Sequence, residues 1–117
     1  MTPQEEVKAQ QALLEKHCHA IFMTDEEIRP YLRFYERLMR PNMHNFVDPG
    51  DYHTQALNDW AEYKNINKKI AHKIREVRQT LKADTIWIHG DQFMMVPQYI
   101  RQNENPANRP AIGFYFH

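Results

Sequence analysis

The chain has 117 residues, enough for one domain with a modest hydrophobic core. Its 15 Lys and Arg residues balance its 15 Asp and Glu residues, so the formal net charge is zero and gives no electrostatic reason to expect nucleic acid or an anionic membrane as a partner. The only cysteine, Cys18, excludes an internal disulfide, and three glycines are too few for a glycine-rich phosphate loop.

The apolar runs and the first residues bear on membrane and compartment. No run approaches the roughly 20 apolar residues of a membrane-spanning helix, so we predict no membrane span. Residues 1–10 have neither the apolar core of a secretory signal nor the Arg-rich composition of a transit peptide. We therefore expect an intracellular protein, and the sequence leaves open whether it lies in the cytoplasm or in an organelle such as the mitochondrion.

Three elements are predicted before residue 40. Residues 4–18 have helical spacing, and one face collects Val7, Gln11, Leu14 and Cys18. Residues 19–23 are short and apolar, which favours a strand. A capping box follows, with Thr24 as N-cap and Glu27 three residues later, and it begins a helix.

The helix that starts after Thr24 has an apolar face and two prolines. Pro30 lies beyond the first turn, where it removes a hydrogen bond and should bend the helix. Pro41 should end it, and residues 41–53, with their Asp-Pro-Gly turn signal, should form the main irregular loop. Its apolar face consists of Ile28, Tyr31, Leu32, Phe34, Tyr35, Leu38 and Met39.

The longest predicted element is an amphipathic helix over residues 54–82. Apolar side chains recur at steps of three and four, with one asparagine among them, and the opposite face is basic and polar. The stripe consists of Leu57, Trp60, Tyr63, Asn67, Ile70, Ile74, Val77 and Leu81. The basic run is a solvated face or, failing that, a surface for an acidic partner: Lys68, Lys69, His72, Lys73, Arg75 and Arg78.

The last third of the chain predicts a βαβ unit. Residues 85–89 and 111–117 are nearly continuous apolar runs, which is typical of parallel strands buried on both faces. Between them, Phe93, Val96, Tyr99 and Ile100 share one helix face. Ligands of open α/β sheets bind at the carboxyl ends of the strands. Here those ends carry residues 89–92 and His117.

These C-terminal residues resemble a known family. Residues 86–101, IWIHGDQFMMVPQYIR, and residues 112–117, IGFYFH, are similar to the IW(I/V)HDYHLMLVPxxLR and IGFFLH stretches of the trehalose-6-phosphate synthase family, glycosyltransferase family 20. Upstream, residues 60–71 fit the family's WxxYxxxNxxFA helix, and residues 13–26 fit its LLEK…PIFLSDE stretch. Phe34 and the later Pro41 fit FSNxxLWP, so the match extends over roughly residues 13–117.

The resemblance implies an α/β fold. The family has two Rossmann-like domains in the GT-B arrangement, with a glucose-6-phosphate acceptor in the N-terminal domain and a UDP-glucose donor in the C-terminal domain. This chain matches only an interior piece of the N-terminal domain. We therefore expect residues 1–117 to form a single, truncated, partial Rossmann-like domain with a small parallel sheet and long amphipathic helices.

The family's site residues carry over unevenly. The acceptor-binding tyrosine corresponds to Tyr31, and the histidine of FFLH corresponds to His117; both are present. Arg40 stands where the family has the tryptophan of LWP, Gly90 replaces the acidic residue of HDYH, and Gln92 replaces its second histidine.

These replacements remove chemistry. Tryptophan to arginine removes a surface for sugar stacking, and aspartate to glycine removes a charged acceptor for sugar hydroxyls. Asp91 sits one position later, where it should point elsewhere from a strand end. A retained core pattern with lost polar site residues indicates that the fold outlived the chemistry.

Several candidate residues also have a plainly structural interpretation. Tyr31 fits phosphosugar binding, but we favour a half-buried helix tyrosine. His117 fits a catalytic histidine, but we favour a chain terminus that meets a partner or solvent. His89 should cap a strand inside the fold. The sequence His17-Cys18-His19 lacks zinc-site spacing, so a packed helix end is the better interpretation.

Two hypotheses of function follow. The first is a non-catalytic, trehalose-6-phosphate-synthase-like domain that acts as a structural or accessory subunit of a larger assembly, without a cofactor and with other protein subunits as partners. The second is the acceptor-binding, glucose-6-phosphate half of a UDP-glucose-dependent glycosyltransferase completed by another chain. Under the first hypothesis Ile112, Phe114 and Phe116 are covered by neighbouring subunits.

Overall fold

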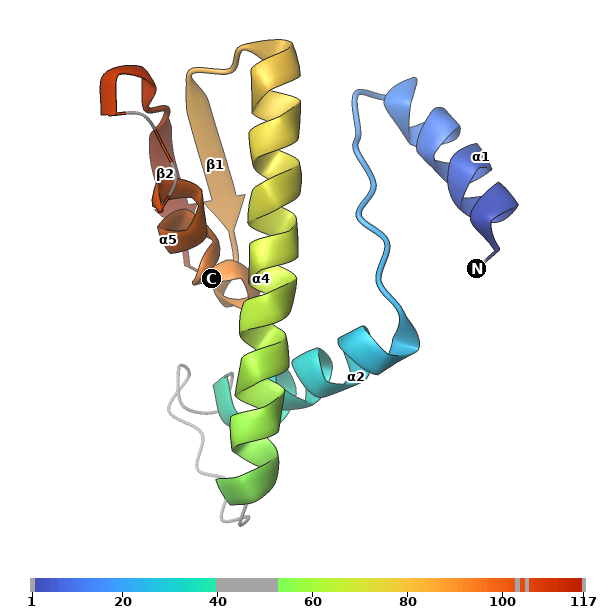
Figure 1. The fold of residues 1–117 in the computed structure, drawn as a ribbon, viewed down its shortest axis with the longest axis vertical. Helices are drawn as coiled ribbons and strands as arrows, with labels where there is room; N and C mark the ends of the chain where they lie inside the picture. Colours follow the sequence, from blue (N-terminus) through green and yellow to red (C-terminus); the bar gives the residue numbers. More distant parts are fainter. Residues whose placement is uncertain (1, 40–52, 103, 105, 117) are drawn as a thin grey trace.

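The structure is a computed structural model that describes residues 2–39, 53–102, 104 and 106–116, without the side chains of residues 53–56 and 106. The long helix α4 forms the middle of the molecule, with the strands and α5 on one side and α1 on the other (Figure 1). The elements in chain order are α1 (Pro3–Leu14), α2 (Asp25–Phe34), η1 (Tyr35–Met39), α4 (His53–Leu81), β1 (Thr85–His89), η2 (Asp91–Phe93), α5 (Val96–Arg101), η3 (Pro106–Asn108) and β2 (Ala111–Tyr115).

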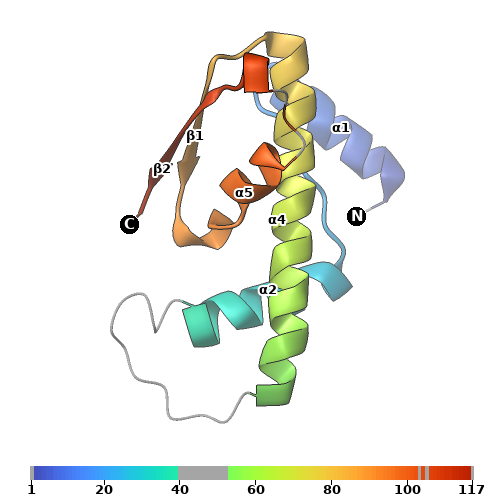
Figure 2. The same cartoon turned by 60° about the vertical axis from the view of Figure 1, so that its left-hand side comes forward.

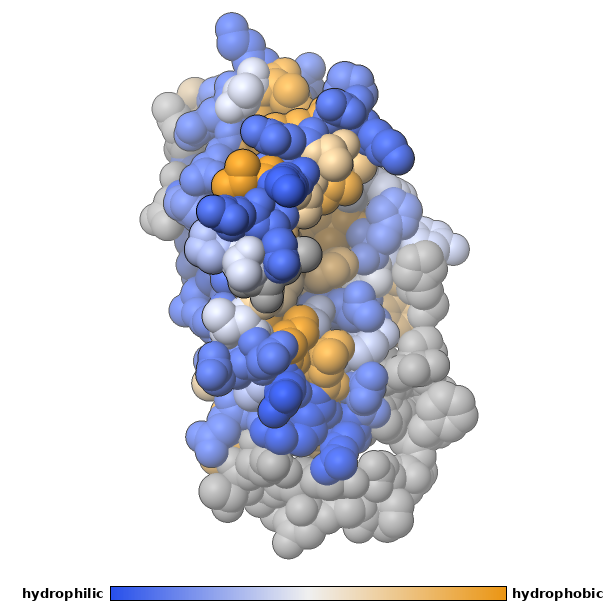
Figure 3. All heavy atoms as spheres, turned by 90° about the vertical axis from the view of Figure 1, so that its right-hand side faces the viewer, coloured by the Kyte–Doolittle hydropathy of each residue, from blue (hydrophilic) through white to orange (hydrophobic). Residues whose placement is uncertain are grey.

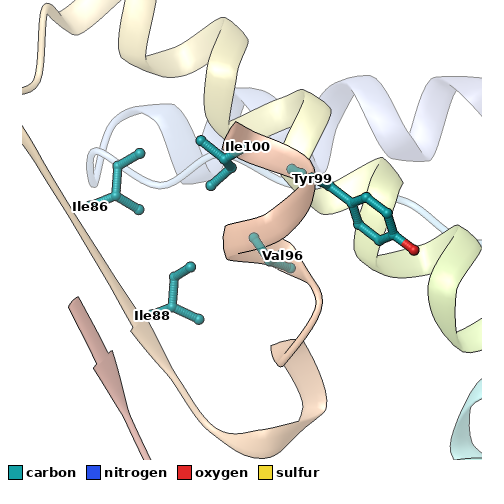
Figure 4. Packing of buried hydrophobic residues seen from close by; sticks show 6 residues of the cluster. Ile86, Ile88, Val96, Tyr99 and Ile100 are labelled. Atoms are coloured by element: carbon teal, nitrogen blue, oxygen red, sulfur yellow. The ribbon is translucent and has the colours of Figure 1, made fainter. Parts of the chain in front are cut away.

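The predicted βαβ unit is confirmed. β1 and β2 pair in parallel, in a register that joins Thr85 to Ala111 and His89 to Tyr115, and α5 lies between this sheet and α4 (Figure 2). Figure 4 shows Ile86 and Ile88 projecting from β1 toward α5. With Val96, Tyr99 and Ile100 of α5 and Ala71 of α4, these two side chains form one hydrophobic cluster.

The prediction that both faces of the strands are buried is wrong. Ile86 and Ile88 are buried, but Trp87 between them is 57% exposed and Tyr115 is 50% exposed. α4 and α5 both pack on the isoleucine face, and no described element covers the other one. We call this surface, carrying Trp87, His89, Gly113 and Tyr115, the outer sheet face. The Trp87 ring lies against Gly113, where any added Cβ atom would collide with it.

A second cluster joins α2 to α4. Tyr31 of α2 packs with Tyr63 and Ile66 of α4. Beside it Arg33 donates to both carboxylate oxygens of Asp59 at 2.7 Å. Asp59 is 3% exposed and the Arg33 side chain is 34% exposed, so this bidentate pair is a partly buried link between the two helices.

The prediction for the long helix is confirmed to within one residue at each end, because α4 runs from His53 to Leu81. Its stripe is not uniformly buried: Leu57 and Leu81 are 72% and 64% exposed, near the two ends of the helix. Much of the basic run has internal contacts. Lys69 pairs with Glu27 at 3.2 Å, and the Lys68 ammonium lies 5.3 Å from the Tyr99 ring.

The prediction for the N-terminal helix needs correction. α1 ends at Leu14 and buries no residue, and Cys18 is exposed. His17 takes a positive φ of 59°, and the amide of Cys18 donates to the carbonyl of Leu13, so the helix ends in a Schellman motif.

On the side of the molecule that Figure 3 shows, patches of exposed apolar side chains lie among hydrophilic ones.

Residues 19–23 form no strand within the described chain, so that prediction is also wrong. A strand needs a neighbouring strand to pair with its backbone groups. Here a side chain accepts one of these hydrogen bonds instead, since the Ala20 amide donates to Gln10 Oε1. Pro30 lies inside α2 as predicted, and α2 is followed directly by the π-helical turn η1. The predicted end at Pro41 and most of the predicted loop fall on residues 40–52, outside the described chain.

The capping box at Thr24 is confirmed, since its hydroxyl accepts from the Glu27 amide at 3.2 Å and Glu27 Oε1 accepts from the Thr24 amide. We expect Thr24→Ala to lower the free energy of unfolding by about 1 kcal/mol, because it removes the side-chain cap of α2. Since α2 packs on α4, a weaker α2 lowers the stability of the folded chain. Thr2→Ala removes the same motif from α1 and should reduce local helicity only. Urea unfolding followed by circular dichroism compares the two variants, and equal losses would contradict the account.

Among the described residues, no helix combines the length and the apolar composition that a membrane crossing requires.

Candidate functional site

The candidate site lies at the carboxyl end of β1, where the chain turns through residues 90–95. Side chains from two helices hold the main chain of this turn. From α2, the Tyr31 hydroxyl donates to the Gln92 carbonyl at 3.3 Å. From α4, the Tyr63 hydroxyl donates to the Asp91 carbonyl at 2.9 Å and accepts from the Met94 amide at 3.2 Å.

Asn67, one helical turn after Tyr63, completes the support. Its Nδ2 donates to the Gln92 carbonyl at 3.2 Å and to the Tyr63 carbonyl at 2.9 Å, and its Oδ1 accepts from the Met95 amide at 3.2 Å. Asn67 and Tyr63 are both fully buried. We call Tyr31, Tyr63 and Asn67 the turn brace, since all three act on the backbone of the same turn.

The environment of the two tyrosines raises the pKa of both hydroxyls, so they stay protonated well above neutral pH. Burial is the largest cause in both: it raises the pKa of Tyr63 to about 12, and it raises the pKa of Tyr31 above its ordinary value. The charge of the buried Asp91 adds to both shifts. The Tyr31 and Tyr63 rings also stack, with centroids 5.7 Å apart and planes 9° from parallel. These hydroxyls are therefore hydrogen-bonding groups directed at the backbone and are poorly suited to act as general bases.

Gly90 opens the turn with φ 96° and ψ 146°, a region that only glycine adopts readily. Its amide donates to the Tyr115 carbonyl at 2.9 Å, which ties the turn to the end of β2. The family that the sequence resembles has an acidic residue at this position. Such a side chain would be strained in the backbone conformation observed at Gly90.

We expect Gly90→Ala and Gly90→Asp to lower the free energy of unfolding by similar amounts, about 1–3 kcal/mol each, because the strain comes from the backbone and not from the kind of side chain. Urea unfolding measures both. If Gly90→Asp left the stability unchanged, the turn would have to adopt a different backbone conformation from the one seen here.

The structure brings some of the predicted site residues together. Tyr31 lies beside the turn, as the ligand-site hypothesis required, but it is 5% exposed and more buried than the expected half-buried residue. His89 ends β1 as predicted, but it is exposed on the outer sheet face, where its ring lies 5.6 Å from that of Trp87 and 5.9 Å from that of Tyr115. The prediction that it caps the strand inside the fold is wrong, since alternation along β1 turns it away from α4. Arg40 and His117 fall outside the described residues.

Sequence reasoning missed the turn brace as a unit. Tyr63 and Asn67 were assigned to the apolar stripe of the long helix. The available signal was Asn67 itself, a polar residue within an otherwise apolar stripe, since a buried asparagine needs several partners. In the described part of the chain, no three His, Cys, Asp or Glu side chains are grouped so as to hold a metal ion.

Comparison with known proteins places the chain in a family. The family model described as glycosyltransferase family 20 matches residues 1–117. An alpha,alpha-trehalose-phosphate synthase [UDP-forming] of Candida albicans is 34% identical over 97% of the chain, which is 23% of that protein. A trehalose-phosphatase of Saccharomyces cerevisiae is 28% identical over 92% of the chain and 12% of its own length.

A third relative has a different kind of name. A trehalose synthase complex regulatory subunit of Saccharomyces cerevisiae is 30% identical over 91% of the chain and 10% of its own length. The chain thus spans less than a quarter of each of these three relatives. The match over the full chain and the parallel βαβ unit with its long helices agree: the chain belongs to glycosyltransferase family 20 and has part of that family's Rossmann-like GT-B fold.

Proposed function

We propose that this chain is a non-catalytic, accessory part of a larger protein assembly. The observation that carries the proposal is the state of Tyr31, which the resemblance matches to the family's acceptor-binding tyrosine. Its hydroxyl is buried and donates to the chain's own Gln92 carbonyl. A sugar hydroxyl or phosphate would have to displace this internal partner.

The turn supports the same proposal. Gly90 supplies no carboxylate, and its backbone conformation disfavours one. The Gln92 carbonyl accepts hydrogen bonds from Tyr31 and Asn67 of the turn brace. The turn is thus organised around contacts within the chain, which supports a structural role over sugar binding.

The outer sheet face and the strand edges supply a reason for association. Trp87 and Tyr115 are half-exposed there, and Phe114 and Phe116 are 36% and 45% exposed. A two-stranded sheet is marginal by itself, and its unpaired edges favour pairing with other chains. We propose that other protein subunits cover these surfaces. The relative named as a regulatory subunit of a trehalose synthase complex supports such a role for members of this family.

The alternative function, the acceptor-binding half of a glycosyltransferase, has one observation in its favour: Tyr31 is retained and lies at the carboxyl end of β1. The two functions differ in ligand binding. We expect no change in the amide NMR signals of Gln92, Met94 and Met95 on titration with glucose-6-phosphate to millimolar concentration. Saturable shifts that vanish in Tyr31→Phe would establish the alternative instead.

Association is tested on the native protein that carries this chain. We expect purification from the source cell to yield a complex of fixed composition, without transfer of glucose from UDP-glucose to glucose-6-phosphate. A monomer in solution with exposed Phe114 and Phe116 would overturn the accessory role. Co-purification with a donor-domain chain and measurable transfer would replace it with a split enzyme.

A further inference from the structure

A concave apolar pocket lies beside the braced turn, between α2, η1 and α4. Its volume is about 430 Å³, within the range of small-molecule sites. Phe34, Trp60 and Tyr63 supply aromatic walls, and Met39, Met94 and Met95 supply thioethers. An apolar cavity of roughly 150 Å³ already accommodates benzene, so this pocket has room for a molecule of two or three rings.

The polar groups that line the pocket restrict which ligands it can bind. None of its described lining residues carries a charge. The one hydroxyl among them, that of Tyr63, donates to the Asp91 carbonyl and accepts from the Met94 amide. Among the described lining residues a sugar phosphate would therefore find no partner to replace the water that it loses. An uncharged apolar molecule loses little on entry and covers the exposed aromatic and thioether surface.

The lining also has the adaptability of a binding site. The rings of Phe34, Trp60 and Tyr63 pack on one another at centroid distances of 5.1–5.6 Å, which fixes one wall. The methionines are unbranched and polarizable, and such side chains adjust to ligands of different shape and contact aromatic rings favourably. The pocket combines a rigid aromatic wall with an adaptable one.

From this geometry we propose that the pocket binds a small, uncharged aromatic or aliphatic molecule. The site adjoins the position where the family's sugar acceptor is expected, but its chemistry is that of an apolar ligand. The inference does not depend on the accessory role, since the pocket consists of this chain's own residues.

The test uses N-phenyl-1-naphthylamine, an uncharged aromatic probe whose fluorescence rises in apolar surroundings. We expect saturable binding with one probe per chain. In methyl NMR spectra the signals of Met39, Met94 and Met95 should shift, whereas that of Met23, which packs near the same aromatic residues but does not line the pocket, should stay in place.

Two matched variants locate the probe. Met94→Asp places a carboxylate at the pocket, at a partly exposed position just before α5 where an acidic residue suits the helix N-terminus. It should weaken binding about tenfold or more. Leu57→Asp adds the same charge to the first turns of α4 at a side chain that does not line the pocket, and it should leave binding unchanged. Absence of saturable binding, equal weakening by both variants, or methyl shifts at Met23 alone would overturn the proposal.

Discussion

Replacing Asn67 by alanine is expected to lower the free energy of unfolding by about 2–5 kcal/mol. Asn67 is fully buried and makes three hydrogen bonds, two from Nδ2 and one to Oδ1. Alanine leaves the Met95 amide without its acceptor and also opens a small cavity. Each buried polar group that loses its partner contributes about 1–3 kcal/mol to the loss.

The same helix offers a matched control. Asn65 is exposed, and its amide donates to Glu62 Oε1 at 3.1 Å. We expect Asn65→Ala to change the stability by less than about 0.5 kcal/mol. Urea unfolding followed by circular dichroism compares the two variants, and hydrogen exchange of the Met95 amide should accelerate only in Asn67→Ala. If both variants lost the same stability, the hydrogen bonds of Asn67 to the turn would not stabilise the fold more than an exposed side-chain contact does.

The sequence was sufficient for the elements whose pattern is local and long. The helix over residues 53–81 was predicted nearly to its ends, because eight stripe positions repeat the same spacing. The parallel pair β1 and β2 was predicted from two apolar runs around a short helix. The capping box at Thr24 was recognisable because both of its hydrogen bonds lie within four residues.

Other features depend on what packs against an element, which periodicity does not specify. Val7 and Leu14 share a helix face in the sequence, yet they are 56% and 45% exposed because no described element lies against them. Trp87 is apolar and in a strand, but it faces the uncovered side of the sheet. Arg33 and Asp59 lie on different helices 26 residues apart, and neither sequence neighbourhood indicates the partner.

The candidate site shows the same division. The family resemblance located Tyr31 and the turn at residue 90, and the structure places them together. The resemblance alone did not indicate that the tyrosine hydroxyl would donate to a backbone carbonyl, or that Gly90 would take a positive φ. Nor did it indicate the support from Tyr63 and Asn67, which donate to the Asp91 and Gln92 carbonyls from 28 and 25 residues earlier in the chain.

Raising the pH from 10 to 12 is expected to lower the free energy of unfolding of the chain steeply. The pKa of Tyr63 is raised from 10.0 to about 12 in the folded state, and that of Tyr31 is raised as well, both mainly by burial. The unfolded chain therefore releases these protons at a lower pH than the folded chain. The stability from these groups is complete below pH 10 and is lost as the pH rises toward 12, by about 1.4 kcal/mol per pH unit for each tyrosine.

Total stabilities of about 5–15 kcal/mol make this loss large enough to bring the chain close to unfolding within the window. Tyrosinate absorbance at 295 nm and far-ultraviolet circular dichroism should change together for the buried tyrosines. Lysine side chains ordinarily titrate near pH 10.4 as well, so the wild-type curve alone does not isolate the tyrosines. The variant Tyr63→Phe isolates one of them, because it lacks the Tyr63 hydroxyl. Above pH 10 its free energy of unfolding should fall less steeply than that of the wild-type chain, and the two slopes should differ by about 1.4 kcal/mol per pH unit. Parallel slopes in the two proteins, or full tyrosinate absorbance before any loss of helix, would show that burial does not hold these protons.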